Sequence, residues 1–149
     1  MFHCAEVGDQ FVAHTRPPVT QEKKNDLPTA LDASTFASAL GQAVWLMTVS
    51  KEHRDLPIRF IEERITPAVL LRQFKIYLKD KQPIAFISWA AVSEEVNARM
   101  QAGGFTLTPA DWRSGNRVVV VECISPFAPK SEIIAQFRAI GPSEGKLKG

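Results

Sequence analysis

The sequence predicts a single α+β domain with a small, mostly antiparallel sheet flanked by helices. Three observations predict it: apolar residues recur at three- and four-residue steps after residue 35, two strand-like segments follow each other at residues 74–90, and a β-branched run stands at 118–124. Helices, then a hairpin, then a further helix and strand are typical of α+β proteins. At 149 residues the chain is long enough to bury one core.

Residues 1–34 carry no sustained helical or strand period, and we expect a loosely ordered N-terminal tail there. The folded domain is therefore predicted at residues 35–149. The tail contains five acidic and three basic groups, whereas residues 50–81 contain eight basic and five acidic groups. This mildly basic middle could meet an acidic partner protein or could be a solvated surface.

The first predicted helix begins at residues 34–35, where serine and threonine favour a cap, and ends in the polar residues 50–55. Its apolar face is predicted to hold Phe36, Leu40, Val44 and Met47. Residues 58–73 are predicted to form two short helices that meet near Thr66-Pro67, because proline interrupts a helix.

Residues 74–78 alternate as a half-buried strand does, and residues 84–90 are almost continuously apolar, so together they predict a hairpin. The rest of the chain is predicted as a helix, a loop, a strand and a helix, at residues 93–103, 109–116, 118–124 and 131–140. Because it is rich in valine, the last strand is expected at the centre of the sheet.

Composition excludes several classes. The formal net charge of +2 is too small to indicate nucleic-acid binding, and the longest apolar stretch, near residues 43–49, is too short for a transmembrane segment. No signal peptide is recognised, so the expected location is cytoplasmic. The cysteines and histidines are dispersed, which predicts neither a disulfide framework nor a metal site, and no cofactor is expected.

His53 follows a helix end in a charged loop, where it could serve as a general base because histidine titrates near neutral pH. The alternative is an exposed histidine without a role. Glu122 is a carboxylate inside a valine-rich strand. It could face solvent, or it could be buried against His53 and hold the imidazole in one tautomer.

A third feature is the polar loop 111–117, which carries Trp112 and two arginines. It could be a rigid turn beside a site or a surface loop with a tryptophan underneath. The signatures of phosphate-cradling loops, of the nucleophile elbow and of the acetyl-coenzyme A loop are absent from the sequence.

The residues between about Leu40 and Ile140 resemble the RTX toxin-activating lysine acyltransferases. Six separated motifs occur in the same order: Gly41 with Trp45-Leu46, Ser50-x-x-His53-Arg54, Pro83-Ile84-Ala85 with Ser88-Trp89-Ala90, the loop Asp111 to Arg117, Ile124-Ser125-Pro126-Phe127 and Phe137-Arg138-Ala139-Ile140. Leu56 and Thr66 stand where the family has tryptophan and leucine.

The resemblance implies a fold similar to that of the Gcn5-related N-acetyltransferases (GNAT). It also implies an enzyme that moves a fatty acyl group from acyl-carrier protein to an internal lysine of a pro-toxin in the cytosol. The family's catalytic histidine, acid and upstream serine fall on His53, Glu122 and Ser50. The tetrahedral oxyanion would need donors, which could be backbone N–H groups with Ser50 or Asn116 assisting. The acyl chain could lie near Trp45, Phe86 and Trp89, although packing in the core is the role first expected of each.

Two departures from the family are visible. Glu122 replaces the family's aspartate, and the chain ends sooner after Ile140 than typical members do. Two rival functions therefore remain: a same-fold acyltransferase that uses acyl-coenzyme A or a small amine, and a non-catalytic module that binds acyl-carrier protein or a target chain. A homodimer is left open.

Overall fold

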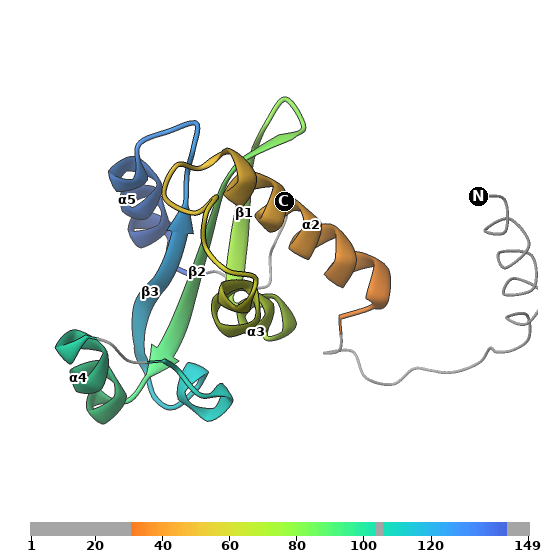
Figure 1. Cartoon of the computed structure of the whole chain (residues 1–149). Helices are drawn as coiled ribbons and strands as arrows, with labels where there is room; N and C mark the ends of the chain where they lie inside the picture. Colours follow the sequence, from red (N-terminus) through yellow and green to blue (C-terminus); the bar gives the residue numbers. More distant parts are fainter. Residues whose placement is uncertain (1–30, 104–105, 143–149) are drawn as a thin grey trace, which may run out of the picture. The chain divides into compact units, whose positions relative to one another are not determined.

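The computed structural model describes residues 31–103 and 106–142. Most of the predicted tail, residues 1–30, lies outside these residues. The described elements are α2 (Ala33–Val49), a π-helix η1 (Ile61–Ile65), α3 (Thr66–Leu70), β1 (Phe74–Lys79), β2 (Gln82–Val92), α4 (Glu94–Ala102), a 3₁₀-helix η2 (Pro109–Trp112), β3 (Arg117–Ile124) and α5 (Lys130–Ile140). The α+β class and the antiparallel sheet are confirmed (Figure 1).

Helix α2 begins slightly earlier than predicted, because Asp32 is its N-cap and its Oδ1 accepts a hydrogen bond from the Thr35 N–H at 2.8 Å. The buried stripe is also rotated from the predicted one. It consists of Ala39, Ala43, Leu46 and Met47, while the other predicted face residues are only half-buried. The small alanines allow α2 to approach the sheet closely.

The two predicted short helices meet at Ile65 and Thr66, as Pro67 indicated. The first is a π-helix, whose wider turn the sequence did not reveal; such single π turns occur often at functional sites. The second, α3, ends at Leu70 before β1.

The sheet has the order β1-β2-β3, with both neighbouring pairs antiparallel. Asp80 and Lys81 join β1 to β2, and both have positive φ (53° and 69°), as in the tight hairpin turns that match strand twist. The central strand is β2, which is buried from Ala85 to Ala90. The expectation that the valine-rich strand is central was wrong: β3 pairs only with β2 among the described residues, and several of its valines are part-exposed.

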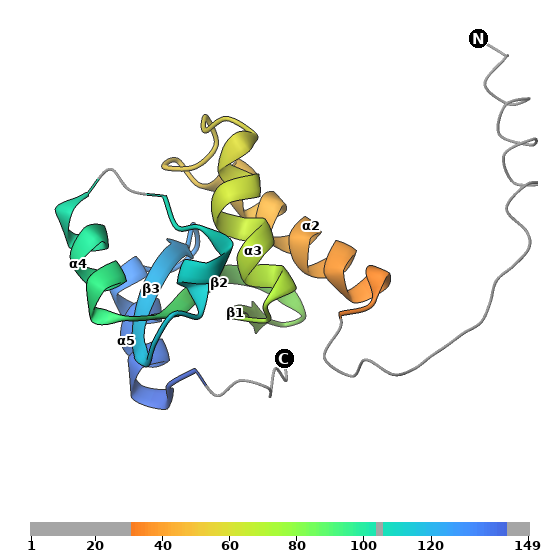
Figure 2. The same cartoon turned by 90° about the horizontal axis from the view of Figure 1, so that it is seen from below.

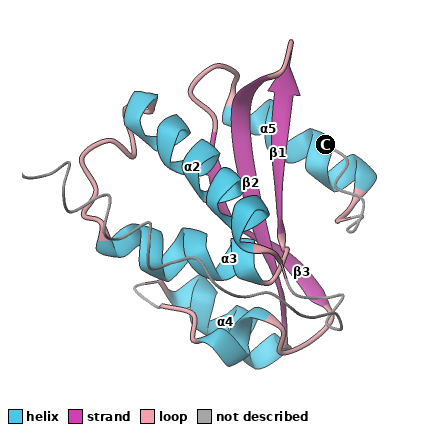
Figure 3. Cartoon of the chain, turned by 90° about the vertical axis from the view of Figure 1, so that its right-hand side faces the viewer, coloured by secondary structure: helices cyan, strands magenta, loops and turns pink. Residues whose placement is uncertain are grey.

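The two faces of the sheet are covered by different helices (Figures 1, 2 and 3). On one face Phe86 and Ile124 pack with residues of α2 and the 61–70 helical segment. On the other face Trp89 and Cys123 pack against Ile133 and Phe137 of α5. A third cluster, including Ala90 and Trp112, fills the end of the sheet near α4. No helix within the described ranges is long and apolar enough to cross a membrane.

Candidate active site

The turn after α2 brings Ser50 and His53 together. Ser50 is the C-cap of α2, and its carbonyl accepts hydrogen bonds from the backbone N–H groups of His53 (3.1 Å) and Arg54 (2.9 Å). This tight turn places the two side chains on the same side. Ser50 is 6% exposed and His53 is 4% exposed. The interpretation of His53 as an exposed loop residue is therefore wrong, because the turn folds its ring inward.

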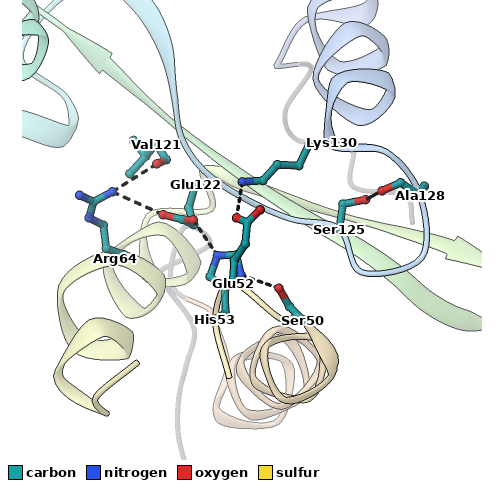
Figure 4. A network of polar contacts seen from close by, with 9 residues as sticks. All are labelled: Ser50, Glu52, His53, Arg64, Val121, Glu122, Ser125, Ala128 and Lys130. Carbon is teal, nitrogen blue, oxygen red and sulfur yellow. Dashed lines mark hydrogen bonds and ion pairs between the residues drawn. The ribbon is translucent and has the colours of Figure 1, made fainter. Parts of the chain in front are cut away.

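Both ring nitrogens of His53 have partners (Figure 4). The Ser50 Oγ lies 2.8 Å from Nδ1, and Glu122 Oε2 lies 2.9 Å from Nε2. An ionised carboxylate can only accept, so a neutral imidazole opposite it carries its proton on Nε2. Nδ1 then holds the free lone pair and accepts a hydrogen bond from the Ser50 hydroxyl. The side chains form a chain from hydroxyl to imidazole to carboxylate, as in the serine–histidine–acid triads of hydrolases.

Glu122 reaches this position from β3, and its side chain is only 14% exposed. Its second oxygen, Oε1, is 3.4 Å from Arg64 Nη1, and the same nitrogen donates to the Val121 carbonyl at 3.3 Å. Arg64 comes from the π-helix η1. The carboxylate is thus held from both sides, by the imidazole and by a guanidinium. Arg64 could not be predicted from the sequence, because no local pattern marks the π turn.

Directly across the strand pair from Glu122 lies Ser88 of β2. Its Oγ is buried and has no hydrogen-bond partner in the described part of the chain. The register shifts between Ser88 and Trp89, so that the strand is irregular beside the carboxylate. Bulges of this kind often re-aim a side chain next to an active site.

A second ion pair fastens the turn that carries His53. Lys130 Nζ lies 2.7 Å from Glu52 Oε1, which joins the first residue of α5 to the turn. The hydrogen bond lowers the pKa of the Glu52 carboxyl and raises the pKa of the Lys130 amine. Cys123, beside Glu122 in sequence, is not a nucleophile candidate, because burial raises the pKa of its thiol to about 11.

The residues proposed to bind the acyl chain lie in different surroundings. Trp45 is 41% exposed and stacks on Phe127 with ring centroids 5.9 Å apart. Trp89 is 7% exposed and stacks on Phe137 at 5.0 Å, so it serves the core between the sheet and α5. Phe86 is fully buried and stacks on Phe74. Of these aromatic side chains, Trp45 is therefore the one available to a ligand.

Asn116 is not brought to His53. It precedes β3, six residues before Glu122, and a strand rises about 3.3 Å per residue, so the two positions are roughly 20 Å apart. An oxyanion role for Asn116 beside His53 would need a large rearrangement.

The loop 111–117 lies at the start of β3, away from His53, and its contacts stabilise the fold. Trp112 is fully buried, and Arg113 donates to Gln73 Oε1 at 2.7 Å and to the Leu71 carbonyl at 2.6 Å. A side chain at Gly115 would come within 2.6 Å of the Ser93 backbone, so only glycine fits there. The loop could have been a rigid turn beside a site or a surface loop with a tryptophan underneath, and the structure shows the second. Within the described ranges, no cluster of histidine, cysteine and acidic residues could hold a metal ion.

Comparison with known proteins adds to this geometry. Residues 32–141 match the model of the RTX toxin acyltransferase (HlyC) family. A lysine-acyltransferase RtxC from Vibrio cholerae is 33% identical over 112 residues, covering 74% of this chain and 73% of that protein. The RTX-II toxin-activating lysine-acyltransferase ApxIIC of Actinobacillus pleuropneumoniae is 31% identical over 101 residues, covering 68% and 63%. A protein-lysine myristoyltransferase HlyC of Escherichia coli is 30% identical over 105 residues, covering 70% and 60%. The chain thus spans about three fifths to three quarters of the length of these relatives.

Proposed function

Because the chain belongs to the RTX toxin acyltransferase family, we propose that it transfers a fatty acyl group from acyl-carrier protein to an internal lysine of a protein target. The product is an amide on the lysine ε-amino group. Relatives named as toxin-activating or as myristoyltransferases support an RTX-toxin-like target and a long acyl chain. The protein would act in the cytoplasm, without a cofactor.

The observation that carries the proposal is the contact chain Ser50–His53–Glu122. A lysine ammonium has a model-compound pKa of about 10.4 and is not a nucleophile until it loses a proton. An imidazole with one lone pair free and the other nitrogen fixed by a carboxylate is suited to take that proton.

We infer that the proton reaches Nδ1 through Ser50, because the Ser50 hydroxyl is hydrogen-bonded to Nδ1 and Nε2 faces Glu122. The ammonium first loses one proton to solvent. As the resulting neutral amine attacks the thioester carbonyl, it passes a second proton to the Ser50 oxygen while the Ser50 hydroxyl proton moves to Nδ1. The tetrahedral intermediate then expels the donor thiolate, which takes up that proton by the same route. The C–N bond forms, the C–S bond breaks, and the amide and the thiol are the products.

Glu122 stabilises the imidazolium that exists during this step. It is one methylene longer than the aspartate of the family, and Arg64 fixes its second oxygen. The intact contacts around His53 favour catalysis over the alternative of a non-catalytic binding module, because a module that only binds has no need of an imidazole held at both nitrogens.

Acyl-carrier protein is the proposed donor because the sequence shows no signature of a phosphate-cradling loop and residues 50–81 are net basic. Docking of an acidic carrier on this surface should weaken with salt. A fold similar to that of the Gcn5-related N-acetyltransferases belongs to the same proposal and rests on the family resemblance.

The test uses the full chain with a Gly/Asp-rich nonapeptide-repeat protein as target. Acylated lysines are counted by mass spectrometry with myristoyl-acyl-carrier protein or myristoyl-coenzyme A at matched concentration. We expect faster transfer from the carrier protein. Equal or better use of coenzyme A would overturn the donor assignment, and no transfer from either would overturn the enzyme assignment.

A further inference from the structure

A shallow depression lies on the exposed side of α2, about three turns before the site. Its volume is about 320 Å³, and its lining includes Ser38, Gly41 and Trp45 of α2 together with Pro83 of β2. Helix α2 rises about 1.5 Å per residue, so Gly41 is roughly 13 Å along the helix from Ser50. The depression and the Ser50–His53 pair therefore lie along one helix.

Gly41 has no structural reason to be glycine. Glycine is among the most destabilising residues in a helix interior, yet Gly41 stands in the middle of α2. A Cβ at this position would meet nothing within 4 Å, so no neighbour excludes a larger residue. Because glycine has no side chain, Gly41 leaves the depression deeper than a larger residue would.

Two exposed apolar side chains lie on α2 between Gly41 and Ser50. Trp45 and Val49 follow Gly41 at four-residue steps, so the three share a face of α2, and both side chains are exposed. Phe127, also exposed, stacks on Trp45 from the loop after β3. That loop is closed by a 2.6 Å hydrogen bond from the Ser125 hydroxyl to the Ala128 carbonyl (Figure 4). An aromatic pair thus lies on the exposed side of α2, in the part of the helix between the depression and the turn that carries Ser50.

We propose that a path along this side of α2 binds the fatty chain of the acyl donor, and that Gly41 sets how long a chain is accepted. The inference rests on the proposed function. The thioester carbonyl lies at Ser50 and His53, and the chain runs back along α2, across Trp45, into the depression over Gly41. The exposed side chains of Trp45, Val49 and Phe127 supply apolar contacts along this direction, which fits a long alkyl chain.

The test compares two donors, myristoyl- and butyryl-acyl-carrier protein, with the parent, Gly41→Leu and the control Ala98→Leu. Ala98 is an exposed alanine of α4, so the control adds the same bulk elsewhere. Filling an apolar subsite discriminates between chain lengths by about tenfold or more. Gly41→Leu should therefore lower kcat/KM for the myristoyl donor by about that factor and leave the butyryl donor unchanged. Ala98→Leu should change neither.

Two outcomes would overturn the inference. An equal loss with both donors would mean that the surface serves docking of a protein, whether the carrier, the target or a second copy of the chain. No loss with either donor would place the alkyl chain elsewhere. In both cases the parent still transfers an acyl group, so the proposed function stands.

Tryptophan emission gives a readout without turnover. Of the three tryptophans, Trp45 is exposed, while Trp89 and Trp112 are buried. Myristoyl-acyl-carrier protein should shift the emission of the parent to shorter wavelength, and the shift should be absent in Trp45→Phe and reduced in Gly41→Leu. If the parent transfers no acyl group but shows this pattern, the proposed function fails and the binding path stands. No shift in the parent would overturn the path.

Discussion

The two ends of β3 both carry polar clusters, and the clusters differ in what their members contact. At the start of the strand, Arg113 and Gln73 direct their hydrogen bonds mainly to one another and to backbone carbonyls. At the other end, Ser50, His53 and Glu122 direct theirs to one another. Side chains that satisfy the backbone hold the fold, whereas a chain of titratable side chains can move a proton.

The surroundings of the two clusters also differ, in how accessible they are to a substrate. Trp112 is fully buried under the first cluster, and a close backbone approach at Gly115 locks its loop. Beside the second cluster stand Trp45 and Phe127, which are exposed. A closed cluster leaves no room for a substrate, whereas the second lies next to an open apolar surface. Sequence reasoning treated both regions as candidates, and the contacts distinguish them.

The largest expected effect comes from His53→Gln, which removes the base from the second cluster. Acyl transfer should fall by on the order of 10²–10⁴-fold, as expected for the loss of a general base. The fold should remain, at a cost of about 1–3 kcal/mol in the free energy of unfolding, because Ser50 and Glu122 lose a buried partner. Mass spectrometry of the target, with circular dichroism as the folding control, measures both. Undiminished acylation would remove His53 from the mechanism.

A smaller effect on activity is expected at the first cluster. Arg113→Met leaves the Gln73 side chain and the Leu71 carbonyl without their donor, so the free energy of unfolding should fall by about 1–3 kcal/mol. The rate per folded molecule should stay near that of the parent. Arg138→Met, an exposed arginine of α5, is the matched control and should change neither. Urea unfolding measures the free energy of unfolding, and acylation assays measure the rate per folded molecule. A large rate loss at parental stability would contradict the distinction between the two clusters.

Much of the fold could be predicted because its signals are local. The cap of α4 at Ser93, its end at Gly103 and the break at Pro67 are each determined by neighbouring residues. The order of the strands is not local. A run of valines indicates a strand, but whether that strand lies at the centre or the edge depends on pairings far along the chain. Among the described strands, β3 pairs with β2 alone.

The site residues also divide into those that could be predicted from the sequence and those that depend on the fold. The resemblance pointed to Ser50, His53 and Glu122, and the structure brings them into contact. Arg64 was missed because its position depends on a π turn. The distance of Asn116 from Glu122 could have been foreseen. Asn116 ends the predicted loop just before the predicted strand 118–124, and the extended chain of that strand separates it from Glu122.

The central claim is that Glu122 supports His53 through its charge. The most direct measurement is the acylation rate of Glu122→Gln and Glu122→Asp beside the parent, with circular dichroism to confirm folding. Glu122→Gln keeps the shape and removes the charge that favours the imidazolium, so its rate should fall by about tenfold to ten-thousandfold. Glu122→Asp keeps the charge and should retain substantial activity. A well-folded Glu122→Gln variant that works at the parental rate would contradict the account.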